Sequence, residues 1–301
     1  MHQKLKGEGD WNLAEIGKAV AYGAVTVINA ISCGFGAALG VNLWTEATVK
    51  LTNEPGWIDG RILSDSEEST VLIKKTVSRV LRHFKLEREW GAYVETQSNI
   101  PIARGLKSSS VAANAITLAS LAALNKKVKD LTAVNIGVDA SLEAGVTITG
   151  AFDDACASFF GGVVITNNFE RKILKRFHPD EGHIILIHVP AIKAYTASLN
   201  VQKMKIVANE VKALHKIALQ GNWLIAMTLN GLVHSSILGC NQNITIDALN
   251  AGAIAAGLSG KGPAVAAVVP PEKREEVKEV WKKYGGDIIE TRINNKKAHE
   301  V

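Results

Sequence analysis

The feature that most constrains the fold is a long stretch without a single charged side chain, residues 19–45. The stretch is long enough to cross a bilayer as a helix, so a membrane span and buried strands are the two structures to weigh. Glycines interrupt it, and β-branched clusters such as residues 25–28 favour buried strands over a lipid-facing helix. We therefore expect no membrane span, and two or three strands over residues 18–51 joined by glycine-rich turns.

Further along the chain, patterns typical of helices and strands alternate. Amphipathic spacing predicts a helix over residues 67–86, with its core face formed by Val71, Ile73, Val77, Val80, Leu81 and Phe84. Residues 111–124 are apolar on almost every side, so they predict a buried helix. The other expected strands are 91–96, 162–166, 183–189, 264–269 and 287–291, and the other expected helices are 131–144, 151–160, 201–218, 246–256 and 272–284. This order predicts an α+β protein of two lobes, preceded by a loose extension over residues 1–15.

Composition excludes several classes of protein. Hydrophobic residues make up 47% of the chain and charged residues 21%, which is typical of a globular protein with enough apolar material for a core. The three cysteines are far apart in sequence and odd in number, so the chain has neither a disulfide framework nor a zinc pattern, and we expect a cytoplasmic location. The formal net charge of +5 is compatible with an anionic small substrate or with a nucleic acid.

The segment 101–110, with the sequence PIARGLKSSS, lies directly before the expected buried helix and has the composition of an anion-binding turn. A helix N-terminus leaves free N–H groups and carries about half a positive charge, so a turn that enters a helix can gather phosphate oxygens. Gly105 lets the backbone approach a ligand, and the serines can cap the helix or coordinate magnesium. An ordinary N-cap after an ordinary turn glycine explains the segment equally well, and the P-loop pattern GxxxxGK[ST] does not occur in the sequence.

A second glycine-rich segment, residues 257–263 (GLSGKGP), is expected between a helix that ends near Ala256 and a strand that begins at Ala264. Glycine at a helix exit is sufficiently explained by capping, so a tight connection is the favoured interpretation. The backbone of this segment is also open enough to approach a ligand.

Two adjacent carboxylates, Asp153 and Asp154, lie in an apolar neighbourhood over residues 146–164. An unpaired buried carboxylate is costly, so such a pair is expected to contact a cation or a metal, or to have a catalytic task. Capping of a helix by one aspartate with exposure of the other is the alternative. Glu143, about three helical turns earlier, could reach the same site, and Lys18 could be either an active-site ammonium or a solvated side chain.

Three segments in order resemble the motifs of GHMP kinases, the superfamily of galactokinase, homoserine kinase, mevalonate kinase and phosphomevalonate kinase. They are Gly17-Lys18, the PIARGLKSSS segment and Gly260-x-Gly262-Pro263. The stretches GKAVAYGAVTVINA, TITGAFDDACASFFGG, NFERKILK and IDALNAGAIAAGLSGKGP look like the archaeal shikimate kinases in particular. The resemblance covers nearly everything from about residue 16 onward.

This resemblance implies the two-lobe GHMP kinase fold. The first lobe, residues 16–161, would be similar to the second domain of a ribosomal S5-like protein and would bind ATP, and the second lobe, residues 162–301, would be ferredoxin-like. The implied reaction is transfer of the γ-phosphoryl group of ATP to the 3-hydroxyl of shikimate, a step toward chorismate and the aromatic amino acids. ATP and Mg²⁺ would be required, and the partners would be shikimate and ATP, with neither nucleic acid nor membrane.

The resemblance also implies roles for individual residues. The ATP phosphates would be cradled by Pro101, Arg104, Gly105, Leu106, Lys107, Ser108, Ser109, Ser110, Gly260 and Gly262. Ser109 would be a magnesium ligand and Glu143 a second one. Asp153 would orient or deprotonate the attacking hydroxyl, with Asp154 as the alternative base, while Lys18 would lower the charge cost nearby. Lys107 stands where the motif usually has a small residue, so it either adds a phosphate contact or crowds the phosphates. Arg104 and Arg61 are candidates for binding the shikimate carboxylate.

Three alternatives remain at the level of sequence. Another GHMP kinase, acting on homoserine, mevalonate or pantoate, would use the same ATP site with a different acceptor pocket. A basic nucleic-acid-binding protein would need a basic stripe with exposed aromatics, whereas lysine and arginine are scattered here and aromatic residues are only 6% of the chain. A catalytically silent family member is the third alternative, which the presence of Ser109, Asp153 and Lys18 disfavours.

Overall fold

The computed structural model describes residues 16–102, 105–191 and 201–301. In these ranges the larger sheet has seven strands: β1 (Ile16–Ile28), β2 (Phe35–Thr52), β3 (Ile58–Ile62), β4 (Gly91–Ser98), β5 (Val163–Asn167), β6 (Lys172–Phe177) and β11 (His299–Glu300). Their order is β11-β1-β2-β4-β3, and β5 pairs with both β2 and β6. The smaller sheet, again among the described residues, has the order β10-β7-β9-β8 and consists of β7 (Ile184–Val189), β8 (Ala255–Leu258), β9 (Val265–Val269) and β10 (Asp287–Arg292).

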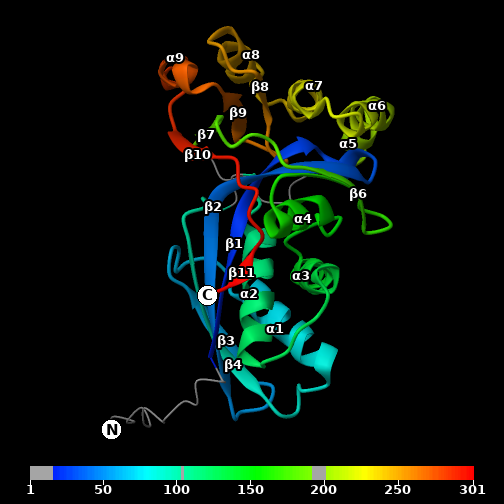
Figure 1. Cartoon of the computed structure of the whole chain (residues 1–301), viewed down its shortest axis with the longest axis vertical. Helices are drawn as coiled ribbons and strands as arrows, with labels where there is room; N and C mark the ends of the chain where they lie inside the picture. The colour runs from blue at the N-terminus through cyan, green and yellow to red at the C-terminus, as the bar shows by residue number, and fades with distance from the viewer. Residues whose placement is uncertain (1–15, 103–104, 192–200) are drawn as a thin grey trace.

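The helices form two groups along an elongated molecule (Figure 1). One face of the larger sheet is covered by α1 (Val71–Phe84), α2 (Ser108–Ala123), α3 (Asp130–Glu143) and α4 (Phe152–Phe160). The second group consists of α5 (Val201–Lys205), α6 (Ala208–Leu219), α7 (Trp223–Leu238), α8 (Asn243–Asn250) and α9 (Arg274–Lys282). Of these, α7, α8 and α9 contact the smaller sheet, whereas α6 packs on α7 and on β2 of the larger sheet. The predicted α+β architecture is confirmed.

The uncharged stretch forms most of β1 and β2, which pair antiparallel from Ile16 opposite Lys50 to Ile28 opposite Ala37. From Val41 to Lys50, the side chains of β2 alternate between buried and more exposed positions, as the sequence predicts. A short 3₁₀ turn, Ala30–Ser32, connects the two strands. The expectation of buried strands is therefore confirmed, and no helix in the described ranges is long and apolar enough to cross a membrane.

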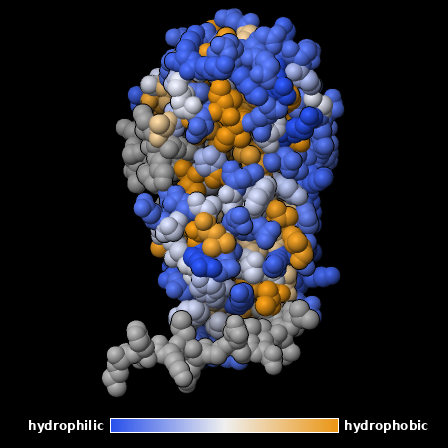
Figure 2. All heavy atoms as spheres, turned by 90° about the vertical axis from the view of Figure 1, so that its left-hand side faces the viewer, coloured by the Kyte–Doolittle hydropathy of each residue, from blue (hydrophilic) through white to orange (hydrophobic). Residues whose placement is uncertain are grey.

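Helix α2 is buried because it packs on β1 and β2 and is surrounded by α1, α3 and α4. Its approach to the sheet is so close that a Cβ atom at Gly17 would collide with the carbonyl oxygen of Ala119. Gly17 therefore serves helix–sheet packing. The face of the molecule in Figure 2 is mainly polar, and its apolar residues form separate patches, as is normal once the large apolar stretches are buried.

Several element boundaries differ from the sequence-based expectation. Helix α1 begins at Val71, whose side chain is 44% exposed although it was expected to face the core. The predicted helix over residues 201–218 is divided into α5 and α6. The predicted helix over residues 246–256 lies instead at Asn243–Asn250, and residues 255–258 form strand β8.

Tertiary packing explains the error at β8. Its sequence, Ala-Ala-Gly-Leu, favours a helix by local propensity. The segment instead pairs with β9, and α7 lies so close to it that a Cβ atom at Gly257 would be 2.6 Å from the carbonyl oxygen of Met227. Pairing with β9 and packing against α7 therefore override the local preference.

Four elements were not predicted: β3, β6, α7 and β11. β6 is a charged segment that lies between the expected strands 162–166 and 183–189. The predicted lobe boundary at residue 162 stays a prediction. Strands β5 and β6, which lie beyond residue 162, still pair with the larger sheet, and the smaller sheet begins only at β7. The predicted extension over residues 1–15 lies outside the described residues.

Candidate active site

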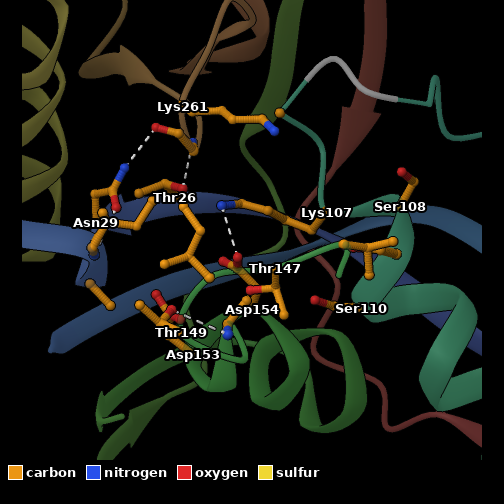
Figure 3. A pocket seen from close by; sticks show the side chains of 18 of the residues that line it. Thr26, Asn29, Lys107, Ser108, Ser110, Thr147, Thr149, Asp153, Asp154 and Lys261 are labelled. Carbon is orange, nitrogen blue, oxygen red and sulfur yellow. Dashed lines mark hydrogen bonds and ion pairs between the residues drawn. The ribbon is translucent and has the colours of Figure 1, made fainter. Parts of the chain in front are cut away.

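A cleft with a cavity of about 350 Å³ lies where the starts of α2 and α4 meet the end of β1 and the turn between β8 and β9. Its lining is mostly small and polar and includes Thr26, Asn29, Gly105, Lys107, Ser108, Ser109, Ser110, Thr147, Thr149, Asp153, Asp154, Gly260 and Lys261. In Figure 3 the labelled side chains, among them Thr26, Lys107, Asp154 and Lys261, come together from elements that are far apart in the sequence. A second cavity of about 120 Å³ shares Ser108 and Ser109 with the first, so the two meet at the start of α2.

Helix α2 presents an uncapped N-terminus to this cleft. Its N-cap residue is Lys107, which has a left-handed backbone with φ of 64° and makes no side-chain capping hydrogen bond. The first turn contains Ser108, Ser109 and Ser110 and no acidic residue. The ordinary serine N-cap considered from the sequence is therefore wrong. The first N–H groups of a helix have no acceptor within it, so they remain available to an anion in the cleft.

The turn over residues 259–263 fastens the loop before α2 to strand β1. Ser259 Oγ donates to the carbonyl oxygen of Gly105 at 2.8 Å, and a Cβ atom at Gly105 would collide with the carbonyl oxygen of Ser259. On the other side, the Gly260 N–H donates to Thr26 Oγ1 and the Asn29 side-chain amide donates to the Gly260 carbonyl oxygen, both at 2.8 Å. This segment is therefore more than the tight connection favoured from the sequence, because it fixes the shape of the cleft.

Helix α4 brings both predicted aspartates to the cleft in its first turn. Asp153 is 4% exposed and Asp154 is 7% exposed. The Asp154 carboxylate pairs with the Lys107 ammonium at 3.0 Å, as Figure 3 shows. The Asp153 carboxylate accepts a hydrogen bond from the Asn168 side-chain amide at 2.8 Å. Neither aspartate is a capping residue, since the N-cap of α4 is Ala151.

Burial sets the protonation of both aspartates. It raises the pKa of Asp153, and the positive charge of Lys107 together with the hydrogen bond from Asn168 partly opposes this. Burial also raises the pKa of Asp154 to about 7, with the nearby Lys107 lowering this pKa and the charge of Asp153 raising it. On the opposite wall, burial and the charge of Lys107 lower the pKa of Lys261 to about 8. The charge of Lys107 therefore acts on both aspartates and on Lys261, so the ionisation of these four groups is linked.

Comparisons with known proteins agree with this arrangement. The model of the GHMP kinases N terminal domain matches residues 72–162, and the model of the GHMP kinases C terminal region matches residues 224–287. A shikimate kinase of Methanosarcina mazei is 44% identical over 94% of this chain and 96% of its own length. A shikimate kinase of Pyrococcus furiosus is 40% identical over 88% of this chain and 95% of its own length. This chain belongs to the GHMP kinases.

Within the GHMP kinases the chain groups with these archaeal proteins, and solved structures of the family share its fold. A homoserine kinase of Cytophaga hutchinsonii superimposes with a TM-score of 0.75 at 17% identity, covering 100% of both chains. A mevalonate kinase of Methanococcus jannaschii superimposes with a TM-score of 0.74 at 18% identity, covering 92% of this chain and 98% of its own. The chain is therefore a small-molecule kinase, and its family implies ATP as the phosphoryl donor.

Two residues that the GHMP resemblance assigned to the site are not brought to the cleft. Lys18 is exposed on β1 opposite Thr48, eight residues before Thr26, which at about 3.3 Å per residue places it roughly 26 Å along the strand. Glu143, at the end of α3, pairs with Arg79 at 2.6 Å and with Arg82 at 3.1 Å, and it does not line the cleft. Both positions correct the expectation, and the ammonium beside the aspartates is that of Lys107.

Of the remaining residues that the GHMP resemblance assigned to the site, some line the cleft and others do not. Gly105 and Gly260 line the cleft, whereas Leu106 is buried in the core and neither Pro101 nor Gly262 is among the lining residues. Arg104 lies outside the described residues. Arg61, a candidate for binding an acceptor carboxylate, is paired with Glu95 at 2.8 Å, and its side chain is 62% exposed away from the cleft lining.

The polar residues of the site that sequence reasoning missed include Thr26, Asn29, Asn168 and Lys261. Thr26 and Asn29 are buried polar residues within the uncharged stretch, and a buried polar residue inside an apolar strand is the signal that could have revealed them. Lys261 lies between the two glycines of the third motif. Asn168 carries no such signal, because the turn between β5 and β6 delivers it from a distance of 15 residues in sequence.

Proposed function

We propose that this GHMP kinase transfers the γ-phosphoryl group of ATP to the 3-hydroxyl of shikimate. The observation that carries the proposal is that one cavity is faced by the uncapped N-terminus of α2 and by the buried carboxylate of Asp153. The first is suited to bind phosphate and the second to accept a proton, which are the two tasks that phosphoryl transfer to an alcohol requires. Relatives that match nearly the full chain carry the name shikimate kinase, and they support shikimate as the acceptor.

We place the nucleotide across the start of α2. Its phosphates would lie in the larger cavity against the first N–H groups of α2 and beside Lys107 and Lys261, which also line that cavity. The base would occupy the second cavity, which has an apolar lining that includes Leu72, Ile73, Ile102 and Ile116. Because Ser108 and Ser109 line both cavities, the two cavities adjoin at the start of α2.

The donors in the cleft also fit Mg²⁺. Asp154 Oδ1 is buried and has no hydrogen-bond partner, which is costly unless a cation meets it. The Ser109 hydroxyl lines the same cavity. No group of three or more His, Cys, Asp or Glu side chains in the described ranges could hold a metal alone, and Mg²⁺ in kinases takes most of its ligands from phosphates and water. Ser109 and Asp154 would hold the ion, which would supply neutralisation of the phosphate charge.

The side chains of this chain divide the chemical work. Asp153 accepts the proton of the attacking hydroxyl and orients it toward the phosphoryl group. Lys107 and Lys261 offset the negative charge that two carboxylates and a triphosphate bring into one buried space. Shikimate suits this cleft as an acceptor, because the ammonium groups of Lys107 and Lys261 would attract its carboxylate. Positioning and charge neutralisation account for most of the acceleration in phosphoryl transfer.

The test is an assay of ADP release with Mg²⁺ and ATP, using shikimate, homoserine, mevalonate and pantoate as separate acceptors. We expect turnover with shikimate, and we expect it to be lost in Asp153→Asn while ATP binding by calorimetry is kept. Asp130→Asn is the matched control, because Asp130 lies in the first turn of α3, is paired with Lys297 on the surface and does not line the cleft. Turnover with another acceptor and none with shikimate would overturn the assignment of the substrate.

We also propose a cytoplasmic location. All three cysteines are free, including Cys33 and Cys156, which are buried. Free thiols are typical of proteins that work in a reducing compartment. Fractionation of cells followed by detection of the protein in the cytoplasmic extract is the expected result, and its recovery in a secreted fraction would contradict the proposal.

A further inference from the structure

The turn between β5 and β6 delivers an amide side chain to the buried side of Asp153. Asn168 is 6% exposed and follows the last residue of β5, while Asp153 lies in the first turn of α4. The Asn168 side-chain nitrogen donates to Asp153 Oδ1 at 2.8 Å. A polar side chain buried to this degree is expected to have a defined partner, and here the partner is the carboxylate that faces the cleft.

The orientation of this amide is fixed by its second contact. The Asn168 side-chain oxygen accepts a hydrogen bond from the hydroxyl of Thr166 at 2.6 Å. An ionised carboxylate can only accept hydrogen bonds, so the NH₂ group must face Asp153 and the oxygen must face Thr166. Strand β5 positions Thr166 through its pairing with Gly36 of β2, so the chain of contacts begins in the larger sheet.

The other side of the carboxylate is closed by backbone. A Cβ atom at Gly36 would collide with Asp153 Oδ2, so β2 must have a glycine there for the carboxylate to fit. The backbone N–H groups at the start of α4 also donate to the Asp153 carboxylate. Asp153 is therefore confined on several sides by groups that do not themselves react, and its remaining open side is the cleft that it lines.

We propose that Asn168 is the positioning residue of the reaction, which holds the Asp153 carboxylate directed at the acceptor hydroxyl, with Thr166 fixing the amide of Asn168. This inference rests on the proposed function of Asp153 as the base. It assigns a role to the turn after β5, which neither the phosphate loop nor the aspartate pair explains.

The charges around Asp153 show why a neutral donor is needed there. The negative charges of Asp153 and of Asp154 on the same helix turn oppose one another, and the nearby cation is Lys107. Lys107 is directly paired with Asp154 rather than with Asp153. Asn168 thus gives Asp153 a donor of its own, and hydrogen bonding to the ionised form lowers a carboxyl pKa.

The test compares Asn168→Ala with Asn114→Ala. Asn114 is an equally buried asparagine that also contacts α4, but its side-chain nitrogen donates to the Ala155 carbonyl oxygen at 2.9 Å and not to a carboxylate. We expect Asn168→Ala to lower kcat about 10- to 100-fold, the loss typical of a hydrogen bond to a charged group, with little change in the KM for ATP. Activity falls with acid as Asp153 takes up a proton, so the acid limb of the pH–kcat profile should move to higher pH, by about one unit.

Asn114→Ala should leave that acid limb in place even if it lowers the melting temperature, because it removes support from α4 without removing a donor from Asp153. Thr166→Val keeps the shape of the side chain in β5 and removes only its hydroxyl. We expect Thr166→Val to lower kcat and to move the acid limb to higher pH, both by less than Asn168→Ala does. If Asn168→Ala does not fold, Thr166→Val still tests the positioning role of Asn168.

The outcomes separate this inference from the proposed function. If Asp153→Asn is inactive but Asn168→Ala and Thr166→Val keep the kcat and the acid limb of the wild type, the positioning role is overturned and the function of Asp153 stands. Equal shifts in Asn168→Ala and Asn114→Ala would also overturn it, since the effect would then be structural. If Asp153→Asn retains full turnover, the assignment of the base fails before Asn168 is considered. Carbon-detected NMR titration of the Asp153 carboxyl, which needs no turnover, should report the same upward shift of its pKa in Asn168→Ala.

Discussion

Helices α2 and α4 both begin at the cleft, and their first turns are built alike but charged differently. The N-cap residues, Lys107 before α2 and Ala151 before α4, both have a left-handed backbone, with φ of 64° and 47°, and neither helix has a side-chain cap. The first turn of α2 carries no acidic residue, whereas that of α4 carries Asp153 and Asp154.

The difference separates a binding surface from a reacting group. An uncapped helix start attracts negative charge, because its free N–H groups and its macrodipole are positive. Helix α4 meets this attraction with its own carboxylates, and the N–H groups help to keep Asp153 ionised despite burial. Helix α2 leaves the attraction unmet in the protein, so a phosphate from outside can satisfy it. In the function we propose, one local structure, used twice, thus prepares both sides of the transfer.

Removing the charge from the start of α4 should have the largest effect. Asp153→Asn keeps the shape of the side chain but cannot accept the hydroxyl proton, so we expect kcat to fall about 10²- to 10⁴-fold. The KM for ATP should change little, because the phosphates belong to α2. Steady-state kinetics with both substrates checks this, and a large rise in the KM for ATP would show that the two helix starts do not divide the work as described.

Adding a charge to the start of α2 should have the next largest effect. Ser108→Asp makes the first turn of α2 resemble that of α4 and places a negative charge against the triphosphate, so we expect the Kd for ATP to rise about 10- to 100-fold. Ser108→Asn is the control of similar size without charge. Calorimetric titration of both variants with Mg-ATP measures the difference, and equal losses of affinity in the two would mean that charge at this position is unimportant.

The cation between the two helix starts should show its effect through pH. Lys107→Asn suits the left-handed backbone but removes the ammonium, so the pKa values of Asp153 and Asp154 should both rise. We expect the acid limb of the pH–kcat profile to move to higher pH by about one unit. Lys107→Arg, which retains the positive charge, is the comparison, and an acid limb that stays in place in Lys107→Asn would exclude Lys107 from this role.

The smallest effect is on stability. Because the folded protein raises the pKa of Asp154 to about 7, from about 4 in an unfolded chain, the folded state binds this proton more tightly. The contribution of Asp154 to the free energy of unfolding is therefore largest below about pH 4 and decreases as the pH rises toward 7. Asp154→Asn lacks this dependence, so its melting temperature should gain on that of the wild type by a few degrees, on the order of 2–4 °C, between pH 5 and pH 8. A constant difference across this range in thermal scans would contradict the raised pKa.

Much of the first lobe could be predicted from the sequence because its signals are local. The uncharged stretch could only be buried, so it predicted β1 and β2. The serine-rich turn before an apolar helix predicted the start of α2 as a place that could receive an anion, and two carboxylates in an apolar segment predicted a charged site at α4. In each case, the burial of a particular residue type follows from its immediate neighbours in the chain.

The rest depended on contacts between distant segments. Strand β8 resembles a helix until β9 pairs with it, and α7 is apolar on too many sides to show a helical period. Lys18 and Lys107 both lie beside a glycine-containing motif. Lys107 lies at the cleft, whereas Lys18 is exposed and is kept away from the cleft by the length of β1. Glu143 has the right spacing from Asp153, but it forms ion pairs with Arg79 and Arg82 of α1 instead. No local pattern contains this information.

The turn over residues 259–263 has a consequence for the order in which the protein becomes active. Both aspartates, Lys107 and the serines of α2 have been synthesised once the first 154 of the 301 residues are made. The hydrogen bonds that join the turn to β1 and to Gly105 span 233, 234 and 154 residues of sequence. Contacts of such long range form late, because the intervening chain must be ordered first. The groups to which we assign catalysis are therefore translated long before the wall that completes their cleft, and on this assignment the enzyme can begin to bind its nucleotide only after the smaller sheet has been synthesised.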